Sequence, residues 1–200
     1  MSLLFETIKV KDGEPQNIGY HNDRFNRSRK DLFGIEQIIY LEEIIKPPLE
    51  YSAGIYRCRV VYDSSITAIS FSRYTMKIIN RLIPVECNGI DYRYKYSDRS
   101  LLDELLRNAN CSYDEEIIIV KNGLITDTSY SNVALFDGTD WITPSTPLLD
   151  GTKRAKLLND GIIREEEIPV ANLKYFESIK LFNAMLDFDE CPTLPIDSIY

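Results

Sequence analysis

The chain has 200 residues, a formal net charge of −8, 44% hydrophobic residues and 27% charged residues. This composition is typical of a soluble globular protein with one large domain or two small ones, long enough to bury a sizeable core. The acidic balance argues against a nucleic-acid-binding protein, because binding to phosphate backbones needs a basic face. It remains compatible with a small anionic ligand in a local basic pocket.

The four cysteines are scattered and form no CxxC pair, so we expect reduced thiols in a cytoplasmic protein. The N-terminal segment M-S-L-L-F-E-T-I-K soon reaches charged residues, which argues against a signal peptide or a spanning helix. His21 is the sole histidine, which excludes a two-histidine metal site. G-x-S-x-G, P-loop and G-x-G-x-x-G sequences are absent.

The first half of the chain predicts a small sheet with helices. Alternating or continuous apolar runs predict the strands, and apolar residues at helical spacing predict the helices. Gly34 ends the first helix, and Pro47 with Pro48 ends the second. The strands are expected at 3–10, 55–62, 66–71 and 77–86, and the helices at 21–33 and 36–46.

The second half predicts more strand than helix. Ser97 or Asp98 is a suitable N-cap for its first helix. The helices are expected at 97–109, 152–159 and 172–177, the strands at 116–120, 124–126, 133–136, 140–143 and 162–169, and a strand or mixed segment at 178–186 before an irregular tail.

We therefore expect an N-terminal α/β domain over 1–91 and a C-terminal domain over 92–200. Lys95 lies near the joint, and ligand sites favour such seams. The sequence Y-R-Y-K-Y sets this lysine between Tyr94 and Tyr96. It is either a surface lysine on a strand or a lysine shielded by the tyrosines and suited to imine formation.

Two other positions suit the binding of charged groups. Asp127 is expected in the turn 126–129, where it either accepts backbone N–H groups or faces inward as an anionic partner. Gly151, Thr152 and Lys153 begin a helix, and the N–H groups and positive dipole of a helix start suit a phosphate. Every helix has such a start, so an ordinary helix is the alternative.

Arg57 and Arg59 alternate on a predicted strand, so both side chains point to one face. Two arginines on one face suit a ligand that carries a carboxylate. An exposed sheet face without a ligand is the alternative.

Several segments of the chain, taken in sequence order, resemble motifs of the class IV aminotransferase family of pyridoxal-phosphate enzymes. That family includes branched-chain aminotransferases, D-amino-acid transaminases and 4-amino-4-deoxychorismate lyases. F-E-T-I at 5–8 resembles a family strand, and His21 with Arg24 resembles its H-x-x-R. The matching segments of the second half are G-L-I-T-D-T-S-Y-S-N-V-A-L-F, W-I-T-P-S-T-P-L-L-D-G-T-K-R and L-F-N-A-M-L, the last of which resembles the lyase branch.

The resemblance implies pyridoxal 5'-phosphate as the cofactor, and no metal. Lys95 would be the Schiff-base lysine, and Asp127 would pair with the ring nitrogen. The residues implied in binding the cofactor phosphate are Arg24, Gly151, Thr152, Lys153 and Asn183. Those implied in binding the substrate are Arg59 or Arg57, together with Arg99, which follows Lys95 by four residues as in similar lyases.

The implied fold is α+β, the two-domain fold of D-amino-acid-aminotransferase-like enzymes. It has an N-terminal α/β sandwich and a C-terminal barrel-like β domain with helices. The resemblance also implies a homodimer with an amino-acid-like substrate. The net charge and the shortness of the apolar runs predict no nucleic-acid or membrane partner.

Three departures from the family pattern stand out. The chain begins near the F-E-T strand, without the strand and turn that usually precede it. Asp127 stands where glutamate is usual, and Lys153 stands where threonine is usual.

We expect a lyase that forms pyruvate and 4-aminobenzoate in the folate pathway. The alternatives are a transaminase of branched-chain or D-amino acids, and a catalytically idle shortened relative.

Overall fold

The computed structural model describes residues 3–200 and divides into two compact units. Unit 1 comprises Met1–Thr75 with Tyr94–Asp98, and unit 2 comprises Met76–Arg93 with Arg99–Tyr200. This division differs from the expected boundary at residue 91, because residues 76–91 belong to unit 2 and the Lys95 segment belongs to unit 1. Each unit is described by itself.

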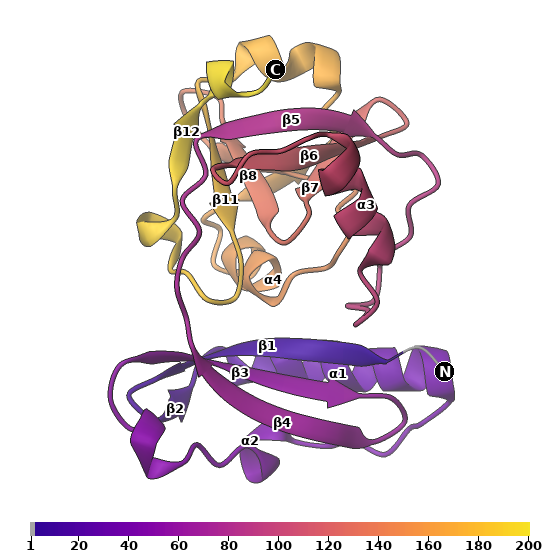
Figure 1. The fold of residues 1–200 in the computed structure, drawn as a ribbon, viewed down its shortest axis with the longest axis vertical. Coiled ribbons are helices and arrows are strands. Elements are labelled where there is room, and N and C mark those ends of the chain that lie inside the picture. Colours follow the sequence, from indigo (N-terminus) through magenta and orange to yellow (C-terminus); the bar gives the residue numbers. More distant parts are fainter. Residues whose placement is uncertain (1–2) are drawn as a thin grey trace. The chain divides into compact units, whose positions relative to one another are not determined.

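Unit 1 is a four-stranded sheet with one face covered by a helix (Figure 1). The strand order is β2-β1-β3-β4, and the paired strands are antiparallel. The strands are β1 (Leu4–Lys11), β2 (Glu14–Pro15), β3 (Ile55–Tyr62) and β4 (Ile66–Arg73), and the helices are α1 (Ile18–Phe33), α2 (Leu41–Ile44) and the 3-10 turn η1 (Leu49–Tyr51).

Alternation along these strands explains their two faces, because successive side chains of a strand point to opposite sides. Leu4, Ile8 and Val10 on β1 pack with alternate residues of β3 and with Phe25 of α1 in one apolar cluster. The opposite face carries Phe5 together with polar and cationic side chains. Gly34 ends α1 in the left-handed conformation, as its sequence position predicts.

The predicted helix at 36–46 is wrong over most of its length, because only Leu41–Ile44 is helical. Side chains of α1 bind the backbone of this segment in an extended form. Asn26 exchanges two hydrogen bonds with Ile39, and Asn22 accepts one from the Leu41 N–H at 2.9 Å. These bonds satisfy the peptide groups that a helix would have paired internally.

Unit 2 contains two sheets. The three-stranded sheet has the order β5-β6-β7, and the five-stranded sheet has the order β10-β9-β8-β11-β12. The strands are β5 (Arg81–Glu86), β6 (Glu115–Lys121), β7 (Leu124–Thr128), β8 (Asn132–Phe136), β9 (Trp141–Pro144), β10 (Arg164–Glu166), β11 (Ser178–Phe182) and β12 (Thr193–Pro195).

Both sheets of unit 2 contribute side chains to one apolar core, with Leu82 and Ile118 from the first sheet and Val133 and Ile179 from the second.

The helices of unit 2 are short. The helices are α3 (Ser100–Asn108), α4 (Thr152–Asn159) and the 3-10 segments η2 (Val170–Tyr175), η3 (Phe188–Glu190) and η4 (Ile196–Ser198).

The structure corrects four expectations for unit 2. The strand predicted at 162–169 is confined to Arg164–Glu166, and the tail contains the strand Thr193–Pro195. The N-cap of α3 is Arg99 rather than Ser97 or Asp98. Asp127 lies within a strand instead of a turn, since β7 continues to Thr128 through its pairing with Ile118.

The overall composition of strands and helices confirms the predicted α+β class. Within residues 3–200, no helix has the length and apolarity that a membrane span requires.

Candidate functional site

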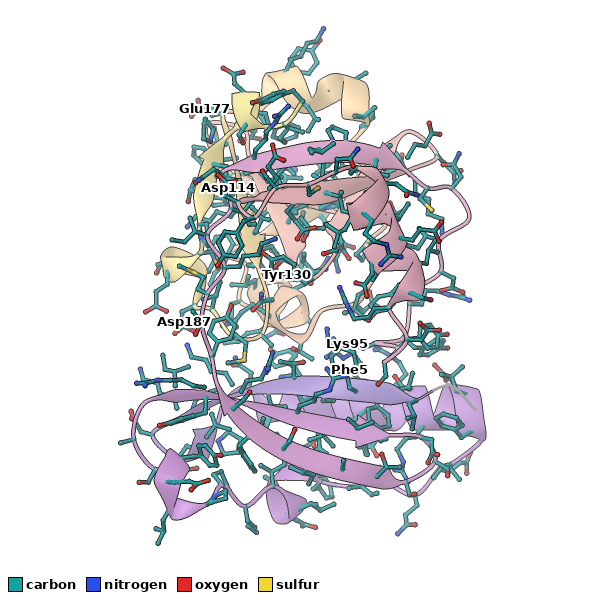
Figure 2. The ribbon with its side chains drawn as sticks, in the orientation of Figure 1. Phe5, Lys95, Asp114, Tyr130, Glu177 and Asp187 are labelled. Carbon is teal, nitrogen blue, oxygen red and sulfur yellow. The ribbon has the colours of Figure 1, made fainter. Side chains whose placement is uncertain are left out.

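The Lys95 segment is attached to the start of β1 in unit 1. The Phe5 N–H donates to the Lys95 carbonyl at 2.9 Å, and Leu4 forms an antiparallel bridge with Tyr96. Tyr94 and Tyr96 pack against the core cluster on the Leu4 side of the sheet. The Lys95 amine lies 4.9 Å from the centre of the Phe5 ring. Figure 2 labels both residues. Phe5 therefore supplies an aromatic surface beside the amine, which the Y-R-Y-K-Y pattern did not indicate.

Arg24 is held in a buried ion pair on the opposite face of the same sheet. Its Nε and Nη2 atoms donate to the two Glu6 oxygens, at 2.9 and 2.5 Å. His21 Nδ1 lies 2.6 Å from Glu6 Oε2. Burial alone would raise the pKa of Glu6, but the Arg24 charge and the hydrogen bonds from His21 and Arg24 lower this pKa to about 2.

His21 completes this cluster as a neutral ring. Burial is the largest cause that lowers the pKa of His21, and the charges of Arg24 and Lys95 also lower it. The hydrogen bond and the charge of Glu6 raise this pKa but do not outweigh the other causes. The cluster therefore holds one carboxylate and one guanidinium. Because Glu6 uses the Nε–Nη2 edge of the guanidinium, the Nη1 atom of Arg24 points away from Glu6.

Arg57 and Arg59 lie on β3 on the face that carries Phe5, as the alternation predicts. Arg59 pairs with Thr7 across the strands, and Arg57 pairs with Lys9. The Arg59 guanidinium carbon lies 3.7 Å from the centre of the Phe5 ring. One aromatic ring thus contacts both Arg59 and the lysine amine described above.

Asp127 is a buried carboxylate in unit 2 with three N–H donors. Its Oδ1 accepts from Asn132 Nδ2 at 2.9 Å, and its Oδ2 accepts from the Leu148 and Leu149 N–H groups, each at 3.0 Å. Burial raises the pKa of Asp127 to about 6, although the three donors and the charge of Arg154 oppose the rise. A cation placed beside this carboxylate would favour its charged form.

Gly151 begins α4 next to the same network. Its φ of −67° is available to any residue, so the need for glycine here is steric. A Cβ at this position would overlap Asn132 Oδ1, and Asn132 also donates to the Leu149 carbonyl at 3.0 Å. Asn132 therefore connects the start of α4 to Asp127.

The start of α4 carries a buried lysine. Thr152 and Lys153 are both 4% exposed. Lys153 Nζ lies 3.1 Å from Asp187 Oδ1, and the Asp187 side chain is 56% exposed. The N–H groups of the first turn have no intrahelical partner by geometry, so this helix start offers amide donors together with a cation.

Arg99 and Asn183 both contact the turn that follows Asp127. Arg99 Nη2 donates to the Ser129 carbonyl at 2.9 Å, and Nη1 lies 3.5 Å from the Tyr92 hydroxyl. Asn183 Nδ2 donates to Ser131 Oγ at 3.2 Å. Both residues were predicted to contact a ligand, and the contacts that the structure shows for them are with this turn and with Tyr92.

Glu6, Asn132 and Asp187 take part in these contacts but carried no assigned role in the sequence analysis. Glu6 and Asn132 belong to segments that resemble family motifs, so their positions were visible although their roles were not. Asp187 lies outside any quoted motif, and only the folded chain brings it to Lys153. Within residues 3–200, no group of three or more metal-ligating side chains is found.

Comparisons with known proteins identify the family of the chain. Residues 92–189 match the model of the amino-transferase class IV family. A Haemophilus influenzae protein of unassigned function is 40% identical over 187 residues, which cover 92% of this chain and 98% of that protein. A Schizosaccharomyces pombe protein named "Putative aminodeoxychorismate lyase" is 32% identical over 203 residues, covering 92% of this chain and 86% of that protein.

A solved structure from Haemophilus somnus 129PT, described as a "putative 4-amino-4-deoxychorismate lyase", is also similar. It has a TM-score of 0.84 and 36% identity, and the match covers 92% of this chain and 97% of that one. The chain belongs to the class IV aminotransferase family. This confirms the predicted family and the predicted fold.

Pyridoxal 5'-phosphate is the cofactor that this family membership assigns to the chain. The residues present fit that group. Lys95 is a primary amine, Asp127 is a buried carboxylate, and α4 offers amide donors at a glycine where a side chain would overlap Asn132. An imine-forming amine, an anion for the ring nitrogen and an anion-binding helix start are what pyridoxal phosphate requires.

Proposed function

We propose that the chain is a pyridoxal-phosphate-dependent lyase of the 4-amino-4-deoxychorismate type, which forms pyruvate and 4-aminobenzoate. The family membership supports the cofactor chemistry. The likeness to two proteins that carry lyase names, at 32% and 36% identity, supports the lyase over other reactions of the family. The proposal includes a homodimer and a role in folate synthesis, as the family resemblance implies, and a cytoplasmic location, as the scattered cysteines predict.

The observation that carries the proposal is the connection from Asp127 through Asn132 to Gly151. It connects a buried carboxylate to the start of α4, two contacts apart in one unit. A pyridine ring with a phosphate arm needs an anion at one end and N–H donors at the other. If the aspartate and the helix start served unrelated purposes, we would not expect both to contact one side chain, Asn132, that leaves no room for a Cβ at position 151.

Each residue has a role in the proposal. When bound, the cofactor supplies an aldehyde that condenses with amines and a ring that takes up the electrons of the broken bond. Asp127 would hold a proton on the ring nitrogen. The phosphate would be held by Arg24, by the backbone of Gly151 to Lys153 and by Asn183. Lys95 Nζ removes the proton from the substrate carbon that bears the amine.

The second candidate is a class IV transaminase, because the family membership covers both reactions. The same residues serve it, but Lys95 then returns the proton at a different carbon, and a keto acid is consumed. A lyase turns over without a keto acid. Turnover of 4-amino-4-deoxychorismate in the absence of any keto acid therefore supports the lyase, and strict dependence on a keto acid supports the transaminase.

The first experiment is an absorption spectrum of the protein with added pyridoxal phosphate. We expect a visible band of lysine-bound cofactor that borohydride fixes, and a labelled peptide that contains Lys95. Lys95→Ala is expected to lack both. Lys30→Ala is a suitable control, since its side chain is 65% exposed on the last turn of α1.

Three outcomes separate the hypotheses. A band in the parent and in Lys30→Ala, but not in Lys95→Ala, supports the proposed role of Lys95. The same band in Lys95→Ala overturns that role. Absence of any band in the parent overturns the cofactor assignment and leaves an idle relative of the family as the remaining hypothesis.

A further inference from the structure

We infer that Asp187 is an internal counter-ion of Lys153, and that the phosphate of the cofactor displaces it when the phosphate binds at the start of α4. Asp187 thereby limits how tightly the chain holds the phosphate. The inference rests on the proposed function, because it takes the backbone of Gly151 to Lys153 as the phosphate site. All of these residues belong to unit 2.

The ion pair between Lys153 and Asp187 has one fixed partner and one movable partner. Lys153 Nζ lies 3.1 Å from Asp187 Oδ1. The Lys153 side chain is buried, whereas more than half of the Asp187 side chain is exposed. Packing around its stem holds the ammonium in place, and the carboxylate can turn into water, which already surrounds much of it. If the pair opens, Asp187 is therefore the partner that leaves.

The position of Asp187 in the chain gives its carboxylate a second set of partners. Asp187 directly precedes the 3-10 segment η3, and its side chain bonds to Lys153 rather than capping this segment. An aspartate at such a position commonly accepts hydrogen bonds from the N–H groups that follow it. The Asp187 carbonyl already accepts from the Glu190 N–H at 2.9 Å, so the backbone is held and only the side chain has to turn.

A phosphate at the start of α4 competes with Asp187 for the same cation. Lys153 is the second residue of this helix, whose first N–H groups and positive dipole end favour an anion. A phosphate monoester carries a charge of about −1.5 to −2 at neutral pH, which is more than the single charge of a carboxylate. Two anions beside one ammonium repel each other, so binding of the phosphate favours departure of the exposed carboxylate.

A fixed structural ion pair is the alternative, in which Asp187 only holds η3 against α4. The two interpretations predict effects of opposite sign. If the phosphate displaces Asp187, removal of the carboxylate charge strengthens phosphate binding. If the pair is fixed, the same change leaves phosphate binding as it was, or weakens it because Lys153 loses the group that positions it.

The first test is spectroscopic titration of the full chain with pyridoxal phosphate and with pyridoxal, which lacks the phosphate. Asp187→Asn keeps an oxygen that accepts a hydrogen bond from Lys153 but removes the charge. We expect the preference for pyridoxal phosphate over pyridoxal to be about fivefold larger in Asp187→Asn than in the parent. The gain should shrink as ionic strength rises. An unchanged or smaller preference overturns the inference.

Two further variants assign the effect to the ion pair. Asp189→Asn is the matched control, because it removes the same charge from an exposed residue of η3. Its preference is expected to match that of the parent, and a gain equal to that of Asp187→Asn overturns the inference. Asp187→Asn combined with Lys153→Met should show no gain over Lys153→Met alone, because the cation for which the two anions compete is gone. A full gain in the combination contradicts the displacement.

Thermal unfolding with inorganic phosphate is a second measurement, and it is made without the cofactor. Asp187→Asn leaves the buried ammonium without a counter-ion, so we expect a lower unfolding midpoint than in the parent when phosphate is absent. Phosphate should raise the midpoint more in Asp187→Asn than in the parent, relative to potassium chloride at the same ionic strength. Equal rises in the two proteins overturn the inference.

The two proposals fail in different ways. Absence of the cofactor band in the parent removes the proposed function and this inference with it. A normal band in the parent, together with an unchanged preference in Asp187→Asn, removes only the inference about Asp187.

Discussion

Glu6 and Arg24 form a bidentate ion pair in which the carboxylate is fully buried and the guanidinium is nearly so. Glu6 contacts the Nε–Nη2 edge of the Arg24 guanidinium. His21 Nδ1 lies 2.6 Å from Glu6 Oε2 and so helps to hold the carboxylate in place. An arginine held in this way keeps its orientation when an anion arrives or leaves. Glu6 therefore positions Arg24 for the phosphate contact that we propose.

Replacement of Glu6 tests this relationship. Glu6→Gln leaves a buried guanidinium without its carboxylate, and breaking a buried pair in this way costs roughly 3–5 kcal/mol. We expect urea unfolding at neutral pH to show a loss of this size. The loss should shrink as pH falls from about 4.5 toward 2, because the stability from the lowered pKa of Glu6 is fully present above about pH 4.5 and is lost as pH falls through about 2.

The double variant Glu6→Gln with Arg24→Met is the control for this cycle. It removes both charges, so we expect it to recover part of the stability that Glu6→Gln loses. The single variant Arg24→Met completes the cycle. If the double variant loses the sum of what the two single variants lose, the pair does not act as a unit.

The pH dependence of stability provides a second prediction, for Asp127. Its folded-state pKa, raised to about 6, lies above the usual value of 3.8, so the folded state binds a proton more readily than the unfolded state. The contribution is fully present below about pH 4 and is lost as pH rises through about 6. The expected loss relative to Asp127→Asn, which does not titrate, is roughly 3 kcal/mol.

The measurement is urea unfolding of the protein without cofactor, parent against Asp127→Asn, from pH 4 to pH 7. Saturation with pyridoxal phosphate is expected to reduce the loss, because a cation beside the carboxylate favours its charged form. A difference between parent and variant that does not change with pH would contradict the raised pKa.

The parts of the fold that follow local rules could be predicted from the sequence. The hairpin β3–β4 and the helix α4 follow from apolar periodicity and from turn or glycine signals next to them. The segment 36–46 could not be predicted, because its extended form depends on Asn22 and Asn26 of α1. Distant side chains there override a local helical pattern.

The candidate site shows the same division. Arg57 and Arg59 share a face because strand geometry alone requires it. The partners of Arg24 and Lys153 lie 18 and 34 positions away along the chain, so spacing carried no signal for either contact. The strand position of Asp127 was missed because polar residues around it resemble a turn, whereas pairing with β6 extends the strand past it.

Gly151→Ala tests the connection between α4 and Asp127. The added Cβ overlaps Asn132 Oδ1, and Asn132 is held by its bonds to Asp127 and Leu149, so it cannot move away without breaking them. We expect a loss of roughly 1–3 kcal/mol in thermal or urea unfolding. Cofactor affinity is expected to fall as well, since both proposed anchoring groups are disturbed.

Gly89→Ala is the matched control in the same unit. A Cβ at Gly89 meets nothing within 4 Å, so its effect on stability should stay within about 0.5 kcal/mol. Equal effects of the two substitutions would show that the contact with Asn132 does not require glycine at position 151.

Lys153→Met tests whether the buried lysine of α4 contributes to phosphate binding. Methionine keeps the length and apolar volume of the side chain and removes its charge. The Asp187 carboxylate that loses its partner is half exposed, so little stability should be lost. The informative quantity is the affinity for pyridoxal phosphate relative to pyridoxal, which lacks the phosphate. We expect the preference for pyridoxal phosphate over pyridoxal to be about tenfold smaller in Lys153→Met than in the parent, which is the effect of one charge-assisted hydrogen bond.

Lys156→Met is the control, because Lys156 lies on the same helix and forms an ion pair with Asp160. If Lys153 only supports the fold, both affinities will fall together and their ratio will match that of the control.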